Sequence, residues 1–277
     1  MKHLNDLILT IFAFSLSCFT LWGQTKDDLA KGYNLIETQT YSQEEDNELL
    51  ELFRGLRVTD VTDGMDMVGL PNTGLVSSDI HPDWVDVSDM SHVIQGIAVT
   101  ARYVPTQRPD RPAPDEDFSA WEGHFYNKYS SELFAEAIRP GSVVVLDDVE
   151  DKDIGSIGSF NILIWHRLGA VGVVTDASAR DTDEIALQKV PLYLRKKGRG
   201  IRPGRNELES VNRPVDIGGV LVCPGDVVVA DGDGVVVVPR RVAKEVAGYA
   251  KGVLGKDKQG RAREYKLLGR PLDNTVK

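Results

Sequence analysis

The amino-acid sequence predicts a mixed α/β protein with layered sheets and flanking helices. Apolar runs at 142–148 and 170–175 enclose a segment with helical spacing at 158–168, which is the pattern of a strand, a helix and a second parallel strand. Short valine-rich runs between 215 and 238 are separated by turns rich in Gly and Asp, which favours further short strands. With 277 residues, 42% hydrophobic and 27% charged, the chain is long enough to bury one large core.

The first residues have the layout of a secretory signal peptide. A basic start precedes an apolar run at 7–22, and the chain turns polar at 24–28. A membrane span needs about 20 mostly apolar residues, whereas this run is shorter and contains several hydroxyl groups. We expect residues 1–23 to be a cleaved signal and the mature chain to be exported to the periplasm or the medium. Retention as a membrane anchor, or lipid modification of Cys18, is the alternative.

The domain is expected to begin after a polar lead-in. Residues 24–47 are the lead-in, 48–254 the domain and 255–277 a C-terminal extension. Leucines recur near helical spacing within 44–57 behind an acidic first turn, which predicts an amphipathic helix. Residues 59–64 can begin a second short helix, because Thr and Asp are good N-caps.

A long apolar segment and two irregular stretches follow. Residues 92–104 predict a strand, which lies between proline-rich loops at 70–87 and 104–118. The second loop is long enough to be functional, or it is an insertion. In the rest of the chain we expect strands at 142–148, 170–175, 190–195, 215–222, 227–230 and 235–238, and helices at 158–168, 179–189 and 241–254.

The charge balance argues against a nucleic-acid partner. The formal net charge is -10 and the isoelectric point is about 5.0, whereas nonspecific nucleic-acid affinity comes from Lys and Arg side chains that neutralise phosphates. A basic run at 194–205 is either a solvated loop or a patch that holds an anionic substrate or an acidic neighbouring subunit.

Three further groups of residues are interpreted as structural. Without Cys18, Cys223 is the only cysteine of the mature chain, so it has no partner for an internal disulfide and is interpreted as a small buried hydrophobe. Asp226, Asp231 and Asp233 lie in glycine-containing turns without an EF-hand pattern. The five histidines lack metal-ligand spacing.

Five segments, taken in their order along the chain, resemble the RraA-like family. They are GIAVTAR at 96–102, RPGSVVVLDD at 139–148, LGAVGVVTDASARD at 168–181, PVDIGGVLVCPGD at 214–226 and VVVADGDGVVVVP at 227–239. The resemblance implies a swivelling β/β/α sandwich that assembles as a homotrimer or a pair of trimers, with sites near subunit interfaces. It also implies one of two activities. These are cleavage of 4-hydroxy-2-oxo acids to pyruvate, often with oxaloacetate decarboxylation, and inhibition of a ribonuclease by binding.

The resemblance also assigns site residues. Arg180 and Asp181 match the family's Arg-Asp pair. The match implies that Asp181 is the protein ligand of Mg²⁺ or Mn²⁺, with water and the oxygens of a 2-oxo acid substrate filling the other positions. Arg180 would hold the 2-oxo oxygen as it gains enolate charge. Asp176 also matches a family position. One interpretation is that it orients Arg180 or the water around the metal, and the other is that it caps a helix.

A glycine-containing loop before a predicted helix matches the family loop that binds the pyruvate carboxylate through backbone N–H groups. The implied substrate-binding residues of this loop are Gly155, Gly158, Ser159 and Phe160. A helix N-terminus suits an anion, because it has unpaired N–H donors and a favourable dipole.

Position 159 departs from the aldolase pattern. The aldolases have an acidic residue where this chain has Ser159, a third catalytic candidate beside Arg180 and Asp176. A neutral hydroxyl removes a negative charge near the metal and cannot act as a carboxylate base, although Asp151 or Asp153 can substitute for it. Three interpretations stay open: a metal-dependent lyase that releases pyruvate from a 2-oxo acid, a binding protein that kept the fold, and an exported lyase or isomerase of sugar acids that uses the basic run.

Overall fold

The computed structural model describes residues 30–149 and 153–277. It separates into two units, Met1–Glu37 and Thr38–Lys277. The expected signal peptide, Cys18 and Asp151 lie outside the described residues. Within the described residues, no helix has both the length and the apolar character needed to span a membrane.

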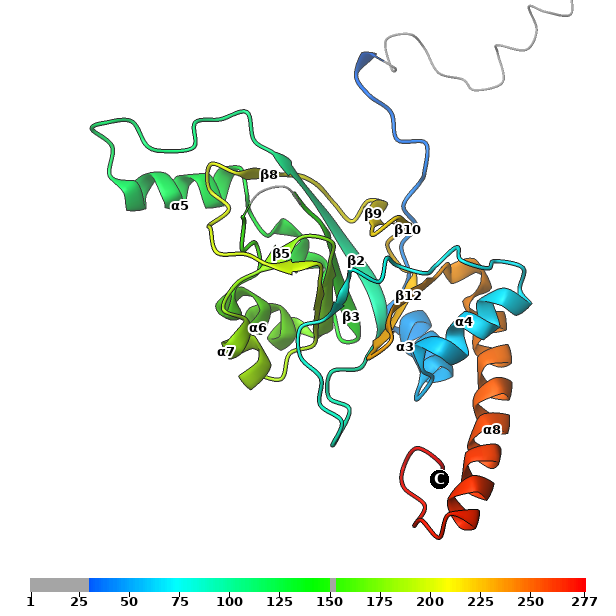
Figure 1. The fold of residues 1–277 in the computed structure, drawn as a ribbon. Coiled ribbons are helices and arrows are strands. Elements are labelled where there is room, and N and C mark those ends of the chain that lie inside the picture. Colours follow the sequence, from blue (N-terminus) through cyan, green and yellow to red (C-terminus); the bar gives the residue numbers. More distant parts are fainter. Residues whose placement is uncertain (1–29, 150–152) are drawn as a thin grey trace, which may run out of the picture. The chain divides into compact units, whose positions relative to one another are not determined.

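A mixed eight-stranded sheet forms the centre of the second unit (Figure 1). Its strands, in spatial order, are β1 (His81–Pro82), β6 (Leu192–Leu194), β4 (Ala170–Thr175), β3 (Ser142–Asp147), β2 (Ile94–Pro105), β11 (Val227–Asp231) and β12 (Gly234–Val238), and β8 (Asn206–Val211) also pairs with β2. Neighbouring strands from β2 through β3 and β4 to β6 are parallel, and the remaining pairs are antiparallel. The parallel part is the strand, helix and strand pattern that the sequence predicts.

Strand β2 connects the two halves of the sheet. One of its edges pairs with β3 from Ile97 to Arg102. Its other edge pairs first with β11 and then, from Ala101 onward, with β8. The register shifts between Arg102 and Tyr103, which marks a bulge within the pairing to β8.

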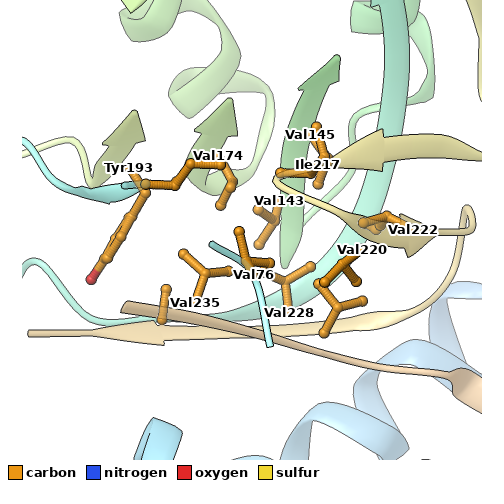
Figure 2. Packing of buried hydrophobic residues seen from close by; sticks show 14 of the residues in the cluster. Val76, Val143, Val145, Val174, Tyr193, Ile217, Val220, Val222, Val228 and Val235 are labelled. Atoms are coloured by element: carbon orange, nitrogen blue, oxygen red, sulfur yellow. The ribbon is translucent and has the colours of Figure 1, made fainter. Parts of the chain in front are cut away.

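Each strand sends alternate side chains to opposite faces of the sheet, as the period of two requires. On the inner face, Val143 and Val145 of β3 join a core that also contains residues of β2, β4, β6, β11 and β12. Figure 2 shows these side chains packing together with those of a separate hairpin, β9 (Val215–Ile217) and β10 (Val220–Val222). The hairpin therefore covers one face of the sheet with apolar side chains.

Helices cover the other face in two groups (Figure 1). Helices α6 (Ser159–Leu168) and α7 (Thr182–Leu187) bury Ile162, Trp165 and Ile185 beside Val144 and Leu146 of β3. Helices α3 (Gln43–Phe53), α4 (Val58–Met67) and α8 (Ala243–Leu267) pack against β11 and β12. The remaining elements are α5 (Phe118–Lys128), the short 3₁₀ helices η1 (Leu133–Ala137) and η2 (Arg240–Val242), and the short strands β5 (Ser178–Ala179) and β7 (Lys196–Lys197).

Specific local residues set two of the helix ends. The side chain of Ser42 accepts from the N–H of Glu45, and the Glu45 carboxylate accepts from the N–H of Ser42, so a capping box starts α3. Gly169 ends α6 with φ of 119°, and a Cβ at this position would lie 2.6 Å from the backbone nitrogen of Pro140. Only glycine meets both requirements.

The expected mixed α/β architecture is confirmed, and three predicted elements differ in detail. The strand predicted at 215–222 is the hairpin β9–β10, because Gly218 and Gly219 adopt positive φ and reverse the chain. The helix predicted at 179–189 begins only at Thr182, because Asp181 has a left-handed φ of 57°. The helix predicted at 241–254 continues to Leu267.

Helix α5 is absent from the sequence-based prediction. Its signals are nevertheless present: the Asp117 side chain accepts from the N–H of Ala120, and Trp121 and Phe125 lie one turn apart on the buried side. The helix follows the proline-rich loop directly, and that loop dominates the composition of the region.

Candidate functional site

Two turns meet at the carboxyl ends of adjacent parallel strands. The loop at 154–159 leads into α6 after β3, and the turn at 176–181 leads into α7 after β4. A parallel bridge joins Ile157 to Ala179, and the N–H of Arg180 donates to the Ile157 carbonyl at 2.8 Å. Ligands in open α/β sheets bind outside the carboxyl ends of the strands, so this junction is the candidate site.

Arg180 crosses the loop at Gly155. A Cβ at Gly155 would lie 2.5 Å from Cβ and 3.0 Å from Cδ of Arg180, so only glycine leaves room for the arginine stem. The Arg180 side chain is 35% exposed, and its Nε lies 3.9 Å from Oδ2 of Asp181. The structure therefore places the guanidinium beside the Asp181 carboxylate and within reach of a ligand from solvent.

Asp181 directs its carboxylate at the start of α6. Oδ2 accepts from the Ser159 N–H at 3.4 Å and lies 3.1 Å from where a Cβ of Gly158 would be. The positive end of the helix dipole favours a negative charge at this point. The left-handed backbone of Asp181 is one that Asp and Asn adopt more readily than most residues.

The structure brings Gly155, Gly158 and Ser159 close to Arg180 and Asp181. One difference concerns the anion-binding donors, because the Ser159 N–H already faces the Asp181 carboxylate. Phe160 is 73% exposed, so its ring faces solvent at the start of α6.

Asp176 lies behind the pair and is buried. Its Oδ1 accepts from the Asp148 N–H at 3.2 Å, and its carbonyl accepts from Nε of Arg195 at 2.9 Å. Asp181, rather than Asp176, occupies the N-cap position of α7. The observed contacts of Asp176 thus connect the ends of β3 and β4 to the residue that follows β6.

The site offers few protein ligands for a hard divalent cation. Among the residues that the structure describes, no cluster of three or more His, Cys, Asp or Glu side chains is arranged to hold a metal. Asp153, one possible substitute for the missing acid, is paired instead with Arg199, whose Nε lies 2.7 Å from its carboxylate and holds the Asp153 pKa below its usual value. Mg²⁺ is often held by one or two carboxylates, with water and substrate oxygens completing its shell. Asp181, whose side chain is 44% exposed, offers one such carboxylate.

The basic run at 194–205 is largely neutralised by acidic side chains from elsewhere in the chain. Its ion pairs are Arg195 with Asp79 at 3.2 Å, Lys197 with Asp83 at 3.1 Å, Arg199 with Asp153 at 2.5 Å, and Arg202 with Glu132. These pairs weaken the argument for a basic patch that binds acidic sugars.

A buried polar cluster behind the loop is absent from the sequence-based prediction. Asp148 and Arg202 are buried, and the charge of Arg202 acts on the pKa of Asp148. Burial raises the pKa of Asp148, while nearby Ser156, Asn206 and Arg202 oppose the rise. The sequence signal is the doublet Asp147-Asp148 at the end of a buried strand, where a second acid is unexpected.

The chain matches known proteins across this region. Residues 58–237 match the RraA-like family model, described as Aldolase/RraA. A protein of Halalkalibacterium halodurans, provisionally named 4-hydroxy-4-methyl-2-oxoglutarate aldolase, is 33% identical over 113 residues. That match covers 40% of this chain and 53% of the relative, so the chain spans little more than half of the relative's length.

Solved structures share the fold. An uncharacterised protein of Pseudomonas syringae pv. tomato has a TM-score of 0.62 at 25% identity, with 87% of this chain and 96% of that chain covered. RraAS2 of Streptomyces coelicolor, described as an unusual member of the RNase ES inhibitor RraA protein family, has a TM-score of 0.64 at 23% identity, with 79% and 98% covered. Because the family model covers more than half of the chain and these structures share its fold, the protein belongs to the RraA-like family.

Proposed function

We propose that this protein is a divalent-metal-dependent lyase that acts on a 2-oxo acid and releases pyruvate. The observation that carries the proposal is the junction of Arg180, Asp181 and the start of α6 at the carboxyl ends of β3 and β4. The guanidinium of Arg180, the carboxylate of Asp181 and the N-terminus of α6 together suit a small ligand with adjacent carboxylate and oxo groups.

Each group has a distinct role in the proposal. The guanidinium of Arg180 would donate to the 2-oxo oxygen and stabilise the negative charge that develops there when the carbon–carbon bond breaks. The N-terminus of α6 would hold the substrate carboxylate through its dipole and the N–H groups of its first turn. Asp181 would hold Mg²⁺ or Mn²⁺, which supplies Lewis-acid polarisation of the substrate oxygens when it is bound.

Ser159 affects the two lyase reactions differently. Retro-aldol cleavage requires a base to remove the proton of the 4-hydroxyl group, and a neutral serine is a poor base. Decarboxylation of oxaloacetate breaks the bond to a carboxylate, releases CO₂ and leaves the electron pair in the enolate, so it needs no such base. We therefore expect oxaloacetate decarboxylation to exceed retro-aldol cleavage.

The test is pyruvate formation by the purified mature protein. Oxaloacetate and a panel of 4-hydroxy-2-oxo acids are supplied with Mg²⁺, with Mn²⁺ and with a chelator. We expect pyruvate from oxaloacetate with either metal, less from the hydroxy acids, and none above background with the chelator. Absence of pyruvate from every substrate at saturating metal would contradict the lyase proposal.

A second candidate function is ligand binding without turnover. The neutral residue at 159 and the engagement of the Ser159 N–H by Asp181 favour it, because both weaken the site as a catalyst. Binding of pyruvate to a protein that forms no product would support this function.

We also propose that the mature chain is exported and assembles in threes. The layout of residues 1–23 and the family resemblance support these two statements, respectively. Intact-mass measurement of protein recovered from the envelope or medium should give a chain that starts near Gln24, and light scattering should give a multiple of three chains. A stable monomer, or soluble cytoplasmic protein that keeps Met1, would count against them.

A further inference from the structure

Asp148, directly after β3, has a buried carboxylate that is only partly satisfied. The residue is 6% exposed. Its Oδ1 accepts from Nδ2 of Asn206 at 2.8 Å and from the N–H of Val149 at 2.6 Å. Its Oδ2 is buried and has no hydrogen-bond partner among the described residues.

Asn206 connects this carboxylate to the loop at 155–159. Its Nδ2 also lies 3.3 Å from Oγ of Ser156, which is buried within that loop. Its Oδ1 accepts from the hydroxyl of Ser130 at 2.9 Å. Because a carboxylate only accepts hydrogen bonds, the amide nitrogen of Asn206 is the atom that faces Asp148, and this contact orients the amide without help from Ser130.

The buried polar cluster around Asp148 and Arg202 also contacts the end of β4 and the start of α6. The N–H of Asp148 donates to Asp176, at the end of β4. At the start of α6, Nδ2 of Asn161 donates to the Glu132 carboxylate at 2.5 Å, and the buried Arg202 pairs with that carboxylate. The polar cluster therefore contacts the strand end, the loop and the first helical turn that carry the candidate site.

A purely structural role does not require a charge at this place. A buried carboxylate with an unpaired oxygen is costly, and apolar residues of similar volume stabilise a core as well or better. Buried polar networks rigidify their surroundings and specify one geometry, and a buried polar group left unsatisfied in a native structure calls for an explanation beyond packing.

We propose that Asp148, Asn206 and Ser156 form a positioning network that fixes the loop at 155–159 in its ligand-binding shape. The network does not touch the substrate; it acts through the backbone of the loop. Its effect on substrate rests on the proposed function, whereas its effect on the loop does not.

Two serines provide a matched pair of variants. Ser156→Ala and Ser130→Ala each remove one buried hydroxyl that contacts Asn206, but only Ser156 belongs to the loop. We expect comparable small decreases in Tm for both. Hydrogen exchange of the loop amides at 156–159 should become about fivefold faster in Ser156→Ala, the change expected when one hydrogen bond that opposes a local opening is lost, and should stay unchanged in Ser130→Ala.

Ligand measurements then extend the test to the site. With oxaloacetate and Mg²⁺, Ser156→Ala should raise KM about fivefold with kcat changed less than about twofold, because weaker positioning affects binding of the carboxylate. Ser130→Ala should leave both constants near the wild-type values. Equal loop exchange in the two variants, or equal KM values, would overturn the positioning network. Wild-type protein that neither binds pyruvate nor forms it would overturn the proposed function alone, because loop exchange is measured without ligand.

Discussion

Asp181→Asn is expected to lower metal-dependent pyruvate formation at least about a hundredfold, the upper end of the loss seen when the partners of metal ligands are removed. The substitution replaces a charged oxygen ligand by a neutral amide of nearly the same shape. Asp181 is the carboxylate that the structure places beside Arg180 at the start of α6. Turnover measured against Mg²⁺ concentration should show no recovery at saturating metal.

The fold should tolerate this change. Asn adopts the left-handed backbone of position 181 as readily as Asp does. Asp183→Asn is the matched control, because Asp183 is exposed two residues further on and lies in the first turn of α7. The control should keep full activity. Equal activity of the Asp181→Asn variant and the wild type would show that the metal, if required, binds elsewhere.

The sequence predicts best those elements that have an unambiguous local pattern. Strands β3 and β4 are continuous apolar runs because both of their faces are buried, and the β11–β12 hairpin is marked by valines on either side of a Gly-Asp turn. Strand β8 has no such pattern, because it carries glutamates on partly exposed positions and pairs only with the second half of β2. Its pairing joins residues about a hundred positions apart, as from Tyr103 to Leu208, so local periodicity does not reveal it.

The same distinction applies to the site. The approach of Arg180 to the loop at 155–159 follows from two parallel strands that end side by side, so motif order along the chain is enough to anticipate it. The network behind the loop was not predictable in this way. Asn206 reaches Asp148 across 58 positions and from the unpredicted strand β8. The Asp147-Asp148 doublet marks an unusual strand end, but it does not indicate which distant residue contacts Asp148.

The helix boundary at α7 shows how one residue with an unusual backbone conformation shifts a local prediction. Composition predicts a helix from 179 onward, yet residues 178–179 pair with β7 and Asp181 adopts a left-handed conformation. The late start lets the N–H of Arg180 bond to Ile157 rather than join a helix. The backbone at 179–180 is therefore hydrogen-bonded to Ile157 and Gly198, and the side chains of Arg180 and Asp181 lie beside the loop that leads into α6.

Ser159→Asp is expected to raise Mg²⁺ affinity about fivefold. A carboxylate about 4–5 Å from a divalent ion in a solvent-exposed site contributes roughly 2 kcal/mol of attraction at high dielectric, and salt screening at physiological ionic strength reduces this to about 1 kcal/mol. The Ser159 N–H lies 3.4 Å from Oδ2 of Asp181, so a carboxylate on the same residue lies close to any ion that Asp181 holds. The first position of α6 also favours an acidic residue through the helix dipole.

Two opposing effects sharpen the test. Without metal, the new carboxylate repels that of Asp181, and this repulsion offsets the favourable effect of the helix dipole, so the metal-free variant should have no higher Tm than the wild type. With Mg²⁺, both carboxylates are attracted to the bound ion. The Tm of the variant should therefore rise more steeply with Mg²⁺ concentration than that of the wild type. Ser159→Asn, which has the same shape without the charge, should show neither effect.

Calorimetric titration with Mg²⁺ and the pyruvate assay at limiting metal measure the outcome together. If the lyase proposal is right, Ser159→Asp should also gain retro-aldol activity relative to decarboxylation, because the added carboxylate can accept the hydroxyl proton that serine cannot. Unchanged Mg²⁺ affinity in Ser159→Asp would place the ion away from the start of α6. A fall in activity together with higher Mg²⁺ affinity would instead identify the serine hydroxyl as the group that the native substrate requires.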